Sequence, residues 1–168
     1  MACFECNLVE KGSAIAKEKH ASAFLHVLPA TIGHTIVIPT RHYPILEGVP
    51  DEAFENLAPL TKKISQVLFD ALECQGTNIL INNGTGAGQD SSHFMIHVLP
   101  RREGDGLHFG WRPQSFPEAY LNQFEEALKT TLQESAKVEQ HHAVEALKTL
   151  KETESTRTYQ IHHLRRIP

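Results

Sequence analysis

Four short segments rich in apolar, β-branched and aromatic residues punctuate the chain and predict strands. Residues 22–28 (SAFLHVL) and 34–39 (HTIVIP) form the first pair, and the proline and glycine of the intervening PATIG predict a hairpin turn. Residues 77–82 (TNILIN) and 92–99 (SHFMIHVL) form the second pair. The pattern therefore predicts two hairpins.

Two segments have apolar residues at helical spacing, one between these two pairs and one after them. Asp51 is a candidate cap for a helix that runs to about residue 73. Ser115 and Glu118 form a capping box with a proline in the first turn, and the stripe that follows predicts one long helix or two shorter ones over residues 117–150. A polar stretch and a tail come after it. Hairpin, helix, hairpin and helix together predict an α+β fold with a mostly antiparallel sheet.

The composition of the chain limits the classes of protein to which it can belong. The 168 residues suit one domain with a proper core. A formal net charge of -4 gives no reason to expect nucleic acid as a partner. No apolar run approaches the roughly 20 residues that span a bilayer, and the N-terminus lacks a signal-peptide pattern. We therefore expect a cytoplasmic protein with no membrane partner.

Two of the three cysteines form a Cys3-x-x-Cys6 pair. In a reducing compartment such a pair is half of a zinc site or a redox pair. A redox pair usually opens a helix that follows a strand, and there is no room for a strand before residue 3. The position therefore favours a metal, whereas Cys74 is most simply a packed core residue.

The segment 92–99 holds two histidines four residues apart. Side chains alternate along a strand, so His93, Met95 and His97 share one face, and the apolar residues between them belong to the core. The histidines are then about 13 Å apart and cannot bind one ion together. Alone, this pattern fits a half-buried strand with surface histidines as well as it fits an active-site strand.

The preceding loop, NGTGAGQD (83–90), favours the active-site interpretation of this strand. Its glycines let the backbone turn and bring amide groups close to an anion. The loop matches neither the dinucleotide-binding fingerprint nor the P-loop. A glycine loop that leads directly into a strand with a histidine face is nevertheless a good candidate for a phosphate site.

The block NNGTGAGQDSSHFMIHVLPRREGDG resembles the signature of the histidine triad (HIT) nucleotide-binding family, and AFLHVLPATIGHTIVIPTRHY resembles its first hairpin. The resemblance implies a HIT-like fold at residues 1–113, with residues 114–168 as a helical extension and tail packed on it. It also implies a homodimer that binds a purine nucleotide or nucleoside phosphate. In the family, the middle histidine of the triad attacks the α-phosphorus and forms a covalent nucleotidyl intermediate.

Carried over residue by residue, the resemblance makes His93 and His97 the outer triad histidines and places Met95 at the nucleophile position. A further five positions match or replace residues around the substrate. Asp90 stands where a hydroxyl side chain commonly contacts phosphate, and His26 where an acidic residue usually binds the ribose. The implied nucleotide-binding set is His26, Asn82, Gly88, Gln89, Asp90 and His97.

These departures predict that the usual reaction is absent. A thioether has no ionisable proton, so Met95 cannot replace an attacking imidazole. A carboxylate at residue 90 would repel phosphate. The alternative is an active hydrolase in which His97 or His26 acts as a general base on water, in a rearranged set with Asp90. The sequence leaves open whether the protein is an enzyme.

The resemblance also implies a metal site. Some family members bind zinc through an N-terminal CxxC, a histidine after the first hairpin and the first triad histidine. The corresponding residues are Cys3, Cys6, His42 and His93. Two thiolates and two imidazoles form a closed tetrahedral set, which is typical of structural zinc, so we expect one structural zinc ion per chain. The resemblance gives His34 a hydrogen bond across the hairpin.

Overall fold

The computed structural model describes the backbone of residues 3–164 and the side chains of residues 3–140, 145, 148 and 149. The chain forms two compact units, Met1–Phe109 and Gly110–Pro168. The first contains a five-stranded antiparallel sheet with the strand order β1-β2-β3-β5-β4. Its strands are β1 (Ala16–Lys17), β2 (Ala21–Leu25), β3 (Thr35–Pro39), β4 (Gly76–Leu80) and β5 (Ile96–Arg101).

The predicted α+β fold and both hairpins are confirmed. Strands β2 and β3 pair antiparallel across the PATIG turn, and β4 pairs antiparallel with β5. The two pairs join through β3 and β5, where Ile36 lies opposite His97. This junction brings the first hairpin, which carries His34, beside the histidine strand. The two-residue β1 was not predicted, because so short a segment carries no pattern.

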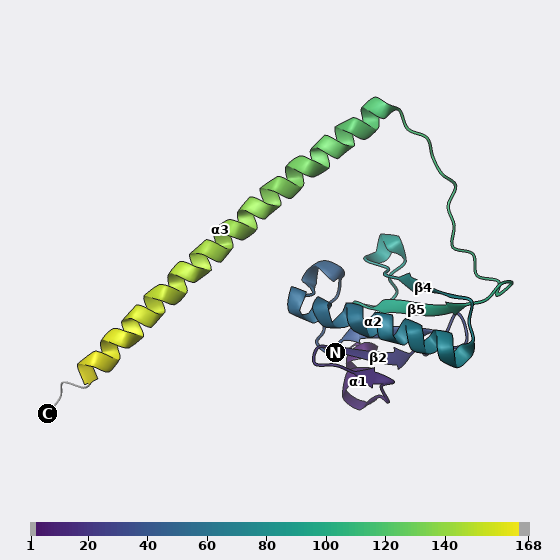
Figure 1. Ribbon diagram of the computed structural model, residues 1–168, viewed down its shortest axis with the longest axis horizontal. Coiled ribbons are helices and arrows are strands. Elements are labelled where there is room, and N and C mark those ends of the chain that lie inside the picture. The colour runs from purple at the N-terminus through teal and green to yellow at the C-terminus, as the bar shows by residue number, and fades with distance from the viewer. Residues whose placement is uncertain (1–2, 165–168) are drawn as a thin grey trace. The chain divides into compact units, whose positions relative to one another are not determined.

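Helix α2 (Asp51–Leu72) runs across one face of the sheet (Figure 1). The predicted cap is wrong by one residue: Pro50 is the N-cap and Asp51 is the first helical residue. Proline holds the extended backbone that precedes a helix, and the Asp51 carboxylate then lies at the positive end of the helix dipole. The main core between α2 and the sheet contains Ala21, Ala23, Val37, Val49, Ala53, Leu57, Leu60, Ile64, Leu68, Phe94, Ile96 and Val98.

A smaller core covers the opposite face of the sheet. Helix α1 (Phe4–Lys11) contributes partly buried apolar residues there. It packs against Phe24, Ile36, Ile38 and Met95. Met95 therefore lies on the α1 face, while Phe94 and Ile96 lie on the α2 face, as the predicted alternation requires.

The strand predicted at 92–99 is wrong at its start, because β5 begins at Ile96. The residues before it are held by the segment that follows β3. The Phe94 amide donates to the Tyr43 carbonyl at 2.6 Å, and His93 bonds the Pro39 carbonyl through its ring. These bonds replace the regular strand ladder and hold His93 with no exposed surface.

The second unit contains α3, a single helix from Glu118 to Leu164. It continues into the tail that was predicted after residue 150, whereas residues 165–168 lie outside the described part of the chain. The predicted stripe is exposed, including Leu121, Phe124, Leu128 and Leu132. Within the described residues, no helix is both long and apolar enough to cross a membrane. The packing of residues 114–168 on the first unit stays a prediction.

Candidate metal and ligand site

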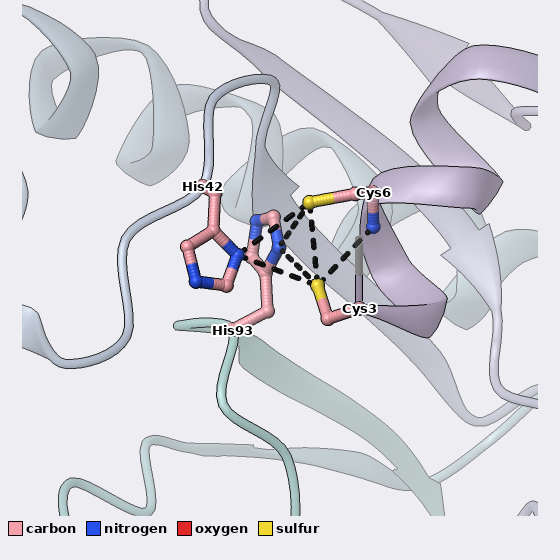
Figure 2. Close-up of side chains that lie close together, drawn as sticks. All are labelled: Cys3, Cys6, His42 and His93. Atoms are coloured by element: carbon pink, nitrogen blue, oxygen red, sulfur yellow. Dashed lines mark hydrogen bonds between the residues drawn. The ribbon is translucent and has the colours of Figure 1, made fainter. Parts of the chain in front are cut away.

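Four metal-ligating side chains from three distant segments converge at the start of α1 (Figure 2). One ligand atom from each of Cys3, Cys6, His42 and His93 lies within 4.8 Å of all the others. The Cys3 Sγ atom is 3.3 Å from both Cys6 Sγ and His93 Nδ1. Zinc bonds of about 2.0–2.3 Å in a tetrahedron give ligand separations of roughly 3.3–3.8 Å. The cluster therefore has the size of a zinc site.

Local structure orients three of these ligands. Cys3 is the N-cap of α1, and the Cys6 amide faces its sulfur at 3.5 Å, so the first helical turn brings both thiols to one side. The His93 Nε2–H donates to the Pro39 carbonyl at 3.1 Å. This bond leaves Nδ1 without a proton and directed at the thiols, as a zinc-binding imidazole requires.

Burial suppresses charge on these ligands in the absence of an ion. It raises the pKa of the Cys3 thiol to about 11, and it lowers the pKa of His93 below the usual histidine value. A thiolate at this position therefore needs a nearby positive charge. A divalent cation supplies one, and a metal binds thiolates and neutral imidazoles in preference to their protonated forms.

A second cluster of imidazoles lies on the same face of the sheet. The rings of His26 and His34 stack with centroids 4.5 Å apart and an interplanar angle of 3°. The His34 Nε2 atom is 3.1 Å from His97 Nδ1. The second hydrogen bond of His34 stays within its own hairpin, where its Nδ1 accepts the Ala30 amide at 3.1 Å.

These contacts fix the tautomers. Because His34 Nδ1 accepts a proton from Ala30, the ring proton of neutral His34 is on Nε2 and is donated to His97. His97 therefore carries its own proton on Nε2. Burial, followed by the neighbouring His26, lowers the pKa of His34 to about 4, and the same two causes lower the pKa of His97. Both rings are neutral at pH 7.

Met95 forms part of the floor of a small cavity of about 150 Å³ beside these rings. The Met95 side chain is only 6% exposed. Three polar side chains, His26, Asp90 and Ser91, line the same cavity. Glu5 of α1 lines it as well, and sequence reasoning missed this residue. No pattern signals it, because its burial depends on how α1 packs on the sheet.

Hydrogen bonds of the Gln89 side chain order the glycine-rich loop. The Gln89 Oε1 accepts the Gly84 amide at 2.7 Å, and its Nε2 donates to the Pro44 and Ser91 carbonyls. Gly88 has φ +82°, a left-handed conformation that suits glycine, and the Asn82 side chain donates to its carbonyl at 3.4 Å. The three predicted loop residues are thus brought together. Their contact with a nucleotide stays a prediction.

The family and relatives of this chain follow from comparison with known proteins. Residues 7–104 match the family model described as the HIT domain. An adenosine 5′-monophosphoramidase of Saccharomyces cerevisiae is 32% identical over 117 residues, which cover 67% of this chain and 72% of the yeast protein.

Two solved structures are also similar. A histidine triad nucleotide-binding protein from Candida albicans has a TM-score of 0.72 at 27% identity, over 79% of this chain and 99% of that one. A zinc-bound histidine triad family protein from Mycobacterium smegmatis has a TM-score of 0.60 at 34% identity, over 68% of this chain and 85% of that one. The matched model begins after Cys6, so the CxxC pair lies outside it.

Proposed function

Because the chain belongs to the HIT domain family, we propose that it binds a purine nucleotide or nucleoside phosphate and lacks covalent nucleotidyl-transfer chemistry. The observation that carries the proposal is the position of Met95. Its buried thioether lies between the small apolar core and the cavity that His26 and Asp90 line. In the proposed alignment of the triad, this is the place of the attacking imidazole.

The chemistry of the methionine side chain supports the loss of that step. A nucleophile that attacks phosphorus must give up a proton or carry a lone pair that tolerates the charge of the adduct. A thioether attack would leave a sulfonium ion in an apolar surrounding, which disfavours charge. His97, which is on the same sheet face, remains able to donate its Nε2 proton to a phosphate oxygen. We propose that it is a binding residue.

A rearranged hydrolase is the second candidate. It is favoured by the presence of two further ionisable residues, His26 and Asp90, at the cavity. A general base there would activate water for direct hydrolysis without a covalent adduct. Turnover of adenosine 5′-phosphoramidate by the unmodified protein would support this candidate over the first.

We also propose one structural zinc ion per chain, held by Cys3, Cys6, His42 and His93. The donor set fits the metal, since two thiolates and two imidazoles satisfy a tetrahedral ion with no open position. A bound ion would tie α1 to the segments before and after the central strands. A reducing location such as the cytoplasm, which is also part of this proposal, would keep the thiols free.

A homodimer is the third part of the proposal. Strand β4 is an edge of the sheet, and Ile79 and Ile81 nearby are 51% and 38% exposed. Both line a mostly apolar hollow of about 380 Å³ beside α2. A strand with one unpaired edge and exposed apolar residues is a surface that a second copy can cover.

Calorimetric titration with purine nucleoside monophosphates tests the main proposal. We expect AMP or GMP to bind, with a stoichiometry of about one per chain for a single pocket. Asn82→Ala should weaken this binding, whereas Asn56→Ala, at a half-buried residue of α2 outside the cavity, should not. No heat of binding at millimolar nucleotide would overturn the nucleotide function and leave only the fold and the metal site.

A further inference from the structure

A cavity of about 690 Å³ lies beside the turn of the first hairpin, and it shares no lining residue with the cavity beside Met95. Its walls come from three distant segments, which are the hairpin turn, the end of α2 and the chain around the end of β5. Most of the residues that line this turn cavity are apolar or carry a thiol: Pro29, Ala30, Ile32, Leu72, Cys74 and Pro100. Such a volume and such walls are typical of a small-molecule site.

Hydrogen bonds hold the walls of the turn cavity in place without a ligand. In the hairpin turn, the Ala30 amide donates to His34 Nδ1 at 3.1 Å, and the Thr31 carbonyl accepts the His34 amide at 3.0 Å. After β5, the Asp105 carboxylate accepts two bonds from the Arg101 guanidinium, at 2.6 and 2.8 Å. The turn cavity is therefore preformed, as small-molecule sites usually are.

The charged residues at the turn cavity leave one cation without a counter-ion. Asp105 is the acidic residue that lines it, and Arg101 already pairs with this carboxylate. Arg102 is the basic residue that lines it, and its Nη2 donates to the Leu72 carbonyl at the end of α2. The carbonyl end of a helix carries only a partial negative charge, and within the described residues no carboxylate forms an ion pair with Arg102. The turn cavity therefore favours an anion.

Thr31 adds an uncommitted hydroxyl group to the same wall. Its Oγ1 atom is buried and has no hydrogen-bond partner among the described residues. Buried polar atoms nearly always have a partner, and an unpaired one destabilises the fold. A rotation of the side chain about its Cα–Cβ bond can turn the hydroxyl toward a ligand in the cavity, to which it can then donate.

We propose that the turn cavity binds a small organic anion, which consists of an apolar body and a single carboxylate group. The carboxylate would pair with the Arg102 guanidinium and accept a hydrogen bond from the Thr31 hydroxyl. The apolar body would fill the space between the hairpin turn and the end of α2. This site does not depend on the proposed nucleotide function, because the two cavities have no residue in common.

4-Phenylbutyrate and 4-phenylbutanamide provide the test, because they have the same apolar body and differ in the charge of the head group. Calorimetry should give the carboxylate about tenfold tighter binding to the full-length wild-type protein, as expected for one charge-assisted hydrogen-bonded pair. Arg102→Gln should reduce this preference to about twofold or less. Lys63→Gln removes an exposed cation of α2 that does not line the turn cavity, and it should keep the preference.

Nuclear magnetic resonance of methyl groups locates the bound probe in wild type. 4-Phenylbutyrate should shift the signals of Ile32 and Leu72, which line the turn cavity, and leave that of Ile79 near the β4 edge unchanged. This measurement needs no substitution, so it remains decisive if Arg102→Gln loosens the end of α2. Arg102→Lys keeps the positive charge and should keep a preference for the carboxylate.

Equal affinity for the two probes overturns the anion site, and so does a preference that survives Arg102→Gln in a protein with an unchanged melting temperature. Failure of both probes to bind, shifts confined to Ile79, or displacement of 4-phenylbutyrate by AMP would each overturn it as well. Binding of AMP alone is measured separately, so loss of the anion site leaves the proposed nucleotide function intact, and the reverse also holds.

Discussion

His34 donates its Nε2 proton to His97 Nδ1 across the boundary between the first hairpin and β5, at 3.1 Å. Burial keeps both rings neutral, and the bond fixes the orientation of the His97 ring. Because His34 is only 5% exposed, protonating it in the folded protein is costly.

Acid should therefore weaken the fold through His34. Its pKa in the folded protein is about 4, below the ordinary 6.5, so the unfolded chain takes up the proton first as pH falls. The free energy of unfolding should decrease from about pH 6.5 to about pH 4, and His34 should account for roughly 1–3 kcal/mol of the loss. Denaturant titrations at several pH values measure this loss. In His34→Gln, the free energy of unfolding should decrease less steeply with falling pH than in wild type.

His108→Gln, at an exposed histidine, is the control and should keep the wild-type dependence of the free energy of unfolding on pH. The same dependence in all three proteins would contradict the assignment to His34.

Removal of the metal should destabilise the N-terminal part of the fold. We expect metal analysis to find about one zinc ion per wild-type chain, and Cys6→Ser to lose most of it, because three ligands and a hydroxyl bind zinc more weakly. Chelation should lower the melting temperature of wild type. Cys74→Ser is the matched control, since that thiol is buried near the end of α2 and bonds the Leu68 carbonyl. Much less than one zinc per chain in protein prepared without chelator would refute the site.

An imidazole at position 95 should restore the covalent nucleotidyl chemistry of the family. If the remaining site is intact, Met95→His should gain adenosine phosphoramidase activity and form a nucleotidyl adduct that mass spectrometry detects after denaturation. Met95→Leu keeps the apolar volume and should gain neither. An adduct on the unmodified protein would show that the proposed loss of covalent chemistry is wrong.

Gly33 should be intolerant of any side chain. It has φ +87°, and a Cβ atom there would overlap Leu72 Cδ1. Gly33→Ala should lower the free energy of unfolding by about 1–3 kcal/mol through backbone strain and overlap. Gly76→Ala has open space around it and should change stability much less. Thermal or denaturant unfolding compares the two, and similar losses would contradict this explanation.

The exposed edge of strand β4 should form the interface of the proposed homodimer. Ile79→Lys should convert a dimer to a monomer in analytical ultracentrifugation, because a charge at the β4 edge opposes pairing with a second copy. Ile32→Lys changes a residue that is 88% exposed in the hairpin turn and should leave the assembly unchanged. A wild-type protein that sediments as a monomer would remove the dimer proposal.

The sequence predicted those features whose cause is local. The alternation around Met95 placed Phe94 and Ile96 in the main core, and the predicted hairpins are present. The CxxC spacing indicated a metal pair, but helix α1, whose first turn brings the two thiols together, was not predicted. The link from Cys3 to His93 came from the family resemblance. The start of β5 was missed because His93 and Phe94 bond to the segment after β3, a contact between distant residues. Burial of Glu5 has the same origin.

Gln89 leaves the glycine-rich loop with little to rearrange. Its side chain joins Gly84, Pro44 and Ser91 before any ligand arrives. A nucleotide would meet a loop backbone that is already ordered, so the entropic cost of ordering the loop is borne at folding and not at binding. Association should then follow a single exponential whose rate rises linearly with nucleotide concentration, with no plateau set by loop closure.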